Sequence, residues 1–162
     1  MKSIISAFVI SSSFLGLSGQ VVGETLSPPS ISVASNGTQL PMQGLEPYFI
    51  GKTRVEPLFG AKGEGRTSGA MVTFEPGSRT NWHTHPIGQT LIVTSGLGWV
   101  QQWDGQRVEI APGDVVQIPA NVKHWHGATD KTAMSHIAVQ EAKAGSVVNW
   151  LEPVRAAQYE GH

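Results

Sequence analysis

The sequence predicts a single all-β domain, and three observations support this prediction. Hydrophobic residues make up 40% of the 162 residues, and charged residues make up only 14%. The chain carries 19 glycines and 10 prolines, a composition that favours short strands and turns over long helices. Short runs of alternating apolar and polar residues recur between turn signals from residue 55 to residue 141. A chain of this length can bury a hydrophobic core in one domain without metal or disulfide support.

The first 23 residues predict a signal peptide. Lys2 gives a positive start, residues 4–17 are mostly apolar, and Val21-Val22-Gly23 has the small residues of a cleavage site. The apolar stretch is short and interrupted by serines, and no later stretch reaches the ~20 apolar residues of a membrane span. We therefore expect a secreted or periplasmic protein that begins near Glu24 and has no membrane contact after processing. A retained anchor is the alternative.

Residues 24–52 predict a leader, and residues 53–159 predict the folded body. Serine, proline, glycine and asparagine dominate the leader up to about Pro47, so we expect it to be partly disordered or to wrap the body as an arm. The chain has no cysteine, which excludes disulfides and a lipidated cysteine anchor. No internal repeat or linker divides the body.

The elements of the body follow from strand patterns and turn residues. We expect strands at 55–59, 67–75, 90–94, 98–104, 107–110, 115–118 and 132–141, and one around His124. Asp104-Gly105 has the composition of a two-residue hairpin turn, and residues 75–78 and 111–114 predict two further turns. Residues 143–159 are ambiguous, and their Ala-Ala-Gln-Tyr end predicts a short helical turn.

The formal net charge of -1, with no long basic run, gives no electrostatic signal for nucleic-acid binding. A small-molecule partner is therefore expected. Five positions suggest its chemistry, because they share strand faces that we expect to point inward: Ala70, Val72, Phe74, Leu91 and Val93. A small apolar pocket of this kind favours a compact, neutral and possibly aromatic substrate over a sugar or phosphate.

Four side chains predict a metal site. His83 and His85 lie two residues apart, so both imidazoles point to one face of an extended strand. Gln89 follows a Pro-Ile-Gly break that can bring its amide oxygen beside them, and His124 offers a fourth ligand from another strand. These neutral donors suit manganese, iron, cobalt, nickel or zinc, and donor type alone does not choose among them.

Three further polar side chains are candidate catalytic residues. His126 shares a strand face with His124, and His136 and Gln140 share a face on the last long strand. Imidazole titrates near neutral pH, so His126 is the candidate acid or base, while His136 and Gln140 are expected to orient the substrate. The alternative is that they only bond to the metal ligands and fill the core.

The spacing of these residues resembles the two sequence motifs of the cupin superfamily. The first motif has its matches at Gly77, His83, His85, Gln89 and Gly96, with glutamine in place of glutamate. The second has its matches at Gly113, Pro119 and His124, with Asn121 and Ala128 in place of glycine and asparagine. Asparagine tolerates the left-handed backbone that glycine supplies at such a turn. The resemblance implies a single-domain cupin fold, a double-stranded β-helix or jelly-roll barrel.

Residues 72–96, 123–127 and 134–141 carry a closer resemblance to small bacterial cupins that include manganese-dependent hydroxynitrile lyases. It implies a metal, manganese as the first choice, held by His83, His85, Gln89 and His124. It also implies reversible cleavage of a cyanohydrin to an aldehyde and hydrogen cyanide, and a homodimer or higher homo-oligomer. The other two readings are a cupin dioxygenase or oxidoreductase acting on a small enol or aromatic substrate, and a non-catalytic small-molecule-binding cupin.

Overall fold

Two antiparallel sheets with facing inner surfaces carry the fold. The computed structural model describes residues 30–161, and from Val33 onward the chain forms one compact unit. The predicted signal peptide at 1–23 and residues 24–29 of the predicted leader lie outside the described residues. No helix among the described residues is long and apolar enough to cross a membrane.

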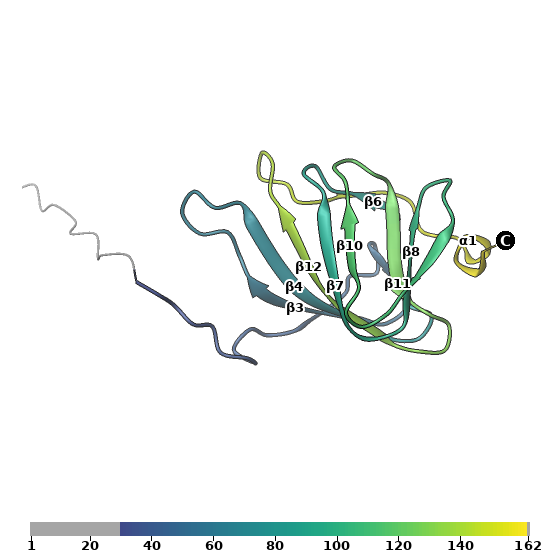
Figure 1. Ribbon diagram of the computed structural model, residues 1–162, viewed down its shortest axis with the longest axis horizontal. Coiled ribbons are helices and arrows are strands. Elements are labelled where there is room, and N and C mark those ends of the chain that lie inside the picture. Colours follow the sequence, from purple (N-terminus) through teal and green to yellow (C-terminus); the bar gives the residue numbers. More distant parts are fainter. Residues whose placement is uncertain (1–29, 162) are drawn as a thin grey trace, which may run out of the picture. The chain divides into compact units, whose positions relative to one another are not determined.

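The first sheet lies on one side of the unit (Figure 1). Its six strands run in the order β1 (Met42–Gln43), β3 (Thr53–Phe59), β4 (Thr67–Phe74), β12 (Met134–Glu141), β7 (Gln89–Gly96) and β10 (Val115–Ile118). β12 is central, because it pairs along its whole length with β4 on one side and from Met134 to Gln140 with β7 on the other. This arrangement places the predicted strands at 67–75, 90–94 and 132–141 next to one another.

The second sheet faces the first and carries the two histidine-rich segments. Its main order is β13 (Asn149–Trp150), β6 (His83–Thr84), β11 (His124–Ala128), β5 (Arg79–Thr80) and β2 (Phe49–Ile50). On its other side β11 pairs with β8 (Gly98–Gln102), which pairs with β9 (Arg107–Ile110). The predicted leader contributes β1 and β2, which pair with β3 and β5.

The core lies between the inner faces of the sheets. The residues expected to point inward do so: Phe74, Val72 and Val93 pack in one buried cluster with Ala70 against it, and Leu91 packs in another. The outer face of the second sheet is covered by the short helix α1 (Ala156–Glu160), whose Tyr159 packs with Trp82 and Trp125. This helix confirms the helical turn predicted from the Ala-Ala-Gln-Tyr sequence.

Two turns show how the sequence pattern relates to the structure. The β8–β9 hairpin exists, but the prediction of an Asp104-Gly105 two-residue turn was wrong. The last pair is Gln101 with Arg107, and the amide of Gly105 donates to the carbonyl of Gln102. This bond centres the turn on Trp103 and Asp104, and Asp104 adopts a left-handed φ of 59° there.

Asn121 has a φ of 61°, which confirms the left-handed backbone expected at this motif position. Its backbone N–H donates to the backbone carbonyl of His85 at 2.8 Å. The turn before β11 is therefore bonded to the segment that follows β6. The turn therefore helps to set the relative position of His85 and His124.

Candidate metal centre

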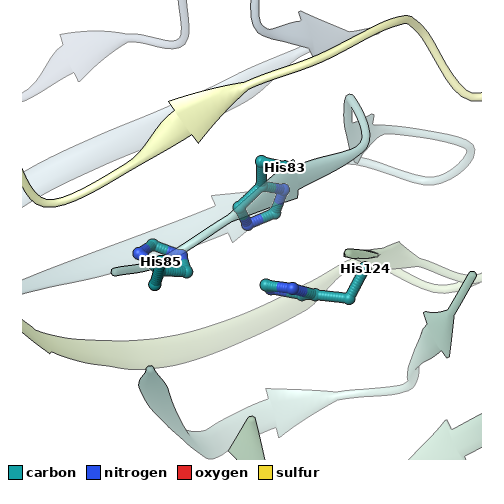
Figure 2. A group of neighbouring side chains, drawn as sticks. All are labelled: His83, His85 and His124. Carbon is teal, nitrogen blue, oxygen red and sulfur yellow. The ribbon is translucent and has the colours of Figure 1, made fainter. Parts of the chain in front are cut away.

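Three histidines meet between the two sheets. His83 lies on β6 and stands opposite His124 of β11 in the strand pairing, so both side chains point to the inner face. His85 follows β6 at the same parity, as the two-residue spacing predicts. The ligand nitrogens of the three residues lie within 4.8 Å of one another, and all three residues are buried. Figure 2 shows the three rings turned toward a common space.

Backbone carbonyls fix the orientation of each ring. The Nδ1 atoms of His83, His85 and His124 lie 2.9 Å, 2.7 Å and 2.9 Å from the carbonyl oxygens of Asn81, Val147 and Val122. A carbonyl oxygen can only accept, so each Nδ1 carries the hydrogen and each neutral ring keeps its lone pair on Nε2.

This arrangement fits a metal ion. His85 Nε2 is buried without a hydrogen-bond partner among the described residues, which is costly for a polar atom. An outer carbonyl that holds the far nitrogen of a ligating imidazole is the usual support of a metal-binding histidine. The His-His-His group is therefore a candidate site for a divalent cation.

Burial keeps the three rings neutral. It is the largest cause that lowers the pKa of His83 well below its usual value, with the nearby His124 adding to the effect. Burial also lowers the pKa of His85, partly offset by the bond to the Val147 carbonyl and by the nearby Gln89 side chain, and lowers the pKa of His124 to about 4. Neutral imidazoles are the form that binds a metal, so the site is ready for a cation at neutral pH.

The structure brings Gln89 to the same place. Gln89 is buried at the start of β7, and its Oε1 lies 3.4 Å from His124 Nε2. Because His124 Nδ1 donates to Val122, this Nε2 holds a lone pair, and two acceptors face each other. A cation bound by both atoms would satisfy them, so Gln89 stays a candidate fourth ligand.

The candidate catalytic histidines form a pair beside this group. His126 and His136 are both buried, and His136 Nε2 lies 3.2 Å from His126 Nδ1. The outer nitrogens of the pair, His126 Nε2 and His136 Nδ1, have no hydrogen-bond partner among the described residues. The His126 ring centroid lies 5.3 Å from that of His83. Burial, and then the neighbouring His136, lower the pKa of His126 well below its usual value.

Gln140 lies apart from this pair. It stands opposite Gln89 in the β12–β7 pairing, and its Nε2 donates to Ser68 Oγ at 3.0 Å. Four residues of strand separate it from His136, about 13 Å at the usual rise per residue. The structure therefore places Gln140 beside the metal-ligand candidate Gln89, whereas His136 bonds to His126.

A C-terminal segment that the sequence analysis left ambiguous contributes to the centre. β13 pairs with β6 and places Trp150 opposite His83, and the two ring centroids lie 4.9 Å apart. Tyr48 stacks on Trp150 from the leader, also at 4.9 Å. Val147 acts through its carbonyl, which no side-chain pattern can reveal. Trp150 is the one aromatic residue between residues 143 and 158, and it was the available signal.

The fold and the histidine group define a cupin, and comparison with known proteins agrees. The family profile described as a cupin domain matches residues 70–140. The chain belongs to the cupin family.

Three similar proteins each cover most of the chain. An (R)-mandelonitrile lyase from Granulicella tundricola is 52% identical over 123 residues, which cover 76% of this chain and 94% of that protein. The solved structure of a cupin-like protein from Thermotoga maritima is 36% identical with a TM-score of 0.70, covering 81% of this chain and 96% of that chain. A polyketide cyclase from Streptomyces resistomycificus shares the fold, with 18% identity, a TM-score of 0.64, and coverage of 81% and 92%.

Proposed function

We propose that this protein is a metal-dependent lyase that cleaves cyanohydrins reversibly to an aldehyde and hydrogen cyanide. The observation that carries the proposal is the group of three buried imidazoles, whose Nε2 atoms face one space beside the unpartnered Nε2 of His126. Similarity to an (R)-mandelonitrile lyase over most of both chains supports this reaction class.

His83, His85, His124 and Gln89 are the proposed ligands, and manganese is the proposed metal ahead of iron, nickel, cobalt and zinc. When bound, such an ion acts as a Lewis acid that polarises a substrate oxygen and lowers the pKa of a hydroxyl group. The four side chains bring no negative charge, so the site suits an alkoxide or cyanide.

His126 is the proposed acid and base. Cleavage requires removal of the hydroxyl proton, breakage of the carbon–carbon bond with its electron pair leaving on cyanide, and protonation of cyanide. A neutral His126 can take the proton on Nε2 and return it to cyanide. This needs the tautomer in which His126 Nδ1–H donates to His136 Nε2, a bond that the 3.2 Å separation allows. His136 would then hold the ring of His126 in place.

The remaining polar and apolar side chains are proposed to position the substrate. Gln140 is held by Ser68 at the same end of the first sheet as Gln89, where its amide can contact a substrate group. The inner faces of β4 and β7 are apolar, so they exclude water and favour a compact neutral substrate. The proposed pocket residues there are Ala70, Val72, Phe74, Leu91 and Val93.

The proposal is tested with purified mature protein of measured metal content. Mandelonitrile and aliphatic cyanohydrins are supplied, and release of the aldehyde is followed beside two variants. We expect His83→Ala to lose both metal and activity. We expect His126→Ala to keep near-normal metal content and to lose turnover by about 10²–10⁴-fold, the usual contribution of a general acid or base.

Two results would contradict these assignments. A fully metallated protein that is silent on all cyanohydrins refutes the lyase, and oxygen consumption with enol substrates becomes the next assay. Full activity in His126→Ala refutes the role of that histidine. Reconstitution of metal-depleted protein with each of the five metals identifies the active ion.

Export and pairing complete the proposal. We expect the mature N-terminus to lie near Glu24, which mass spectrometry of the protein recovered from its native compartment measures. A homodimer is proposed because apolar side chains such as Phe59, Ile92 and Val115 are exposed. Sedimentation velocity measures the assembly.

A further inference from the structure

A groove opens where the two sheets are not joined. The first sheet ends at β10 and the second ends at β9, and among the described residues these strands pair only with β7 and β8. The groove between them, here the seam groove, has a volume of about 520 Å³. Its apolar walls are Val100, Val108, Val116, Ile118, Pro119 and Val122.

The walls belong to the inside of the barrel. Val100 stands opposite His126 in the β8–β11 pairing, and Val108 stands opposite Val100 in the β8–β9 pairing. Residues opposite one another in an antiparallel pair share a face, so both valines are on the face that carries the histidines. On the other side, Ile118 stands opposite Gln89. The seam groove is therefore an open part of the barrel interior.

The floor of the seam groove is His124. The exposed fractions on β9 show where the interior is open. Ile110 is 3% exposed, whereas Val108, on the same face, is 56% exposed. Core side chains fill the interior at Ile110 and leave it open toward Val108 and His124. A molecule that fills this space touches the candidate metal centre directly.

The lining indicates the charge and size of that molecule. None of the residues that line the seam groove is an acid, lysine or arginine, and its polar rim consists of Gln102, Gln106 and Gln117. Such a surface suits a neutral molecule with an apolar body and one or two hydrogen-bonding groups. The volume lies in the usual range of about 300–1,000 Å³ for small-ligand sites.

A second cavity borders the end of β10. It has a volume of about 260 Å³, is lined by Gln89 and Gln140, and shares Ile118 and Pro119 with the seam groove. Glu141 contributes a carboxylate to its lining, so this cavity is smaller and less suited to an apolar group. The seam groove is the better fit for the bulky part of a substrate.

We propose that the seam groove binds the apolar side group of a neutral substrate, and that Val108 limits the size of this group. The substrate's polar end then lies at His124. Binding in the groove does not depend on the reaction, whereas naming the ligand as a cyanohydrin rests on the proposed lyase function.

Binding is tested with the mature, metal-loaded chain and 4-fluorobenzyl alcohol as the probe, followed by fluorine NMR. We expect Val108→Trp to fill the groove and to weaken the affinity for the probe at least tenfold. Glu109→Trp is the matched control, because it adds the same side chain to the opposite face of β9, and we expect it to bind as the wild type does. Gln106→Trp at the exposed rim repeats the test if Val108→Trp does not fold.

Substrate selectivity gives a second readout. If the lyase proposal is correct, Val108→Trp lowers kcat/KM for mandelonitrile at least tenfold more than for the cyanohydrin of acetaldehyde. Glu109→Trp should leave the ratio of the two unchanged. Metal content is measured in every variant.

The outcomes separate the two proposals. Probe binding that depends on Val108 in a protein without lyase activity supports the groove and refutes the lyase. Cyanohydrin cleavage that Val108→Trp leaves unaltered refutes the groove alone. The groove proposal also fails if the wild type does not bind the probe, or if Val108→Trp changes only the oligomeric state, since the groove would then be an interface.

Discussion

The candidate ligand histidines are held by backbone carbonyls, and a pair of buried histidines lies beside the candidate metal centre. His136 is buried, with a pKa lowered from 6.5 to about 4 by burial. Its ring lies 3.2 Å from another buried imidazole, that of His126, and burial lowers the pKa of both rings, so both are neutral at neutral pH. The pair links the stability of the barrel to pH.

We expect the metal-free protein to lose stability as the pH falls from 6.5 toward 4. The unfolded chain binds a proton at His136 below pH 6.5, whereas the folded chain does so only near pH 4. Above pH 6.5 His136 is neutral in both states, so its titration does not change the free energy of unfolding. Below pH 6.5 protonation of the unfolded chain lowers this free energy. A pKa difference of about 2.5 units corresponds to on the order of 3 kcal/mol.

Urea unfolding between pH 7.5 and 4.5 measures this dependence. The variant His136→Gln keeps a polar side chain that cannot charge, so the decline in its free energy of unfolding should be shallower. The other buried histidines still titrate in it, and some decline remains. An identical pH dependence in the two proteins would contradict the assignment.

Asn121 provides a second prediction at the residue scale. We expect Asn121→Val to lower the free energy of unfolding by about 1–2 kcal/mol, because a β-branched residue is strained at its left-handed φ. This corresponds to a fall in Tm of roughly 2–8 °C. Asn121→Gly is the control, which should keep the wild-type Tm and metal affinity. Equal losses in both variants would show that the asparagine side chain, not the backbone, matters.

At the scale of the element, β13 is the least expected part of the centre. It lies outside residues 70–140, which carry the cupin match, yet it pairs with the strand of His83. It places Trp150 against His83, and the residues just before it place the Val147 carbonyl on His85. The C-terminal segment thus orients two of the three imidazoles.

We expect Trp150→Leu to weaken metal binding about tenfold, the lower end of the effect of removing an outer support of a metal ligand. The smaller side chain leaves the His83 ring without the surface on which it packs. Competition with a chelator measures the affinity. Trp99→Leu is the matched control, because Trp99 has a similar burial but packs on Tyr159 outside the barrel. If both variants lose affinity equally, general loosening of the fold is the cause.

At the scale of the whole molecule, the metal is expected to stabilise the barrel. The candidate ligands come from three strands of the two sheets and the segment after β6, so a bound ion joins both inner faces. We expect Tm to rise with metal concentration, because binding stabilises the folded state. At a metal concentration 1,000 times the Kd, the free energy of unfolding rises by about 4 kcal/mol. Thermal unfolding with added metal or chelator measures the rise. His85→Ala should unfold at one Tm under both conditions, and a wild-type response in it would contradict the site.

The sequence by itself determined the class of fold and the positions of the candidate metal ligands. Alternating apolar residues and turn signals indicated the strands, because the pleat of a strand repeats every two residues. The same repeat placed His83 with His85, and His124 with His126, on shared faces. Motif spacing added Gln89, whose amide the structure places 3.4 Å from His124. These are local properties, set by neighbours in the chain.

Only the tertiary structure decided which distant groups meet. The pairing of His126 with His136, the position of Gln140 beside Gln89, and the contact of Trp150 with His83 each depend on strand pairing across the sheets. The carbonyls that fix the imidazole tautomers belong to the backbone, so no residue type signals them. The seam groove exists because β9 and β10 are edge strands of different sheets and do not pair with each other. Side-chain patterns report the face of a strand, whereas contacts between strands follow from the folding of the whole chain.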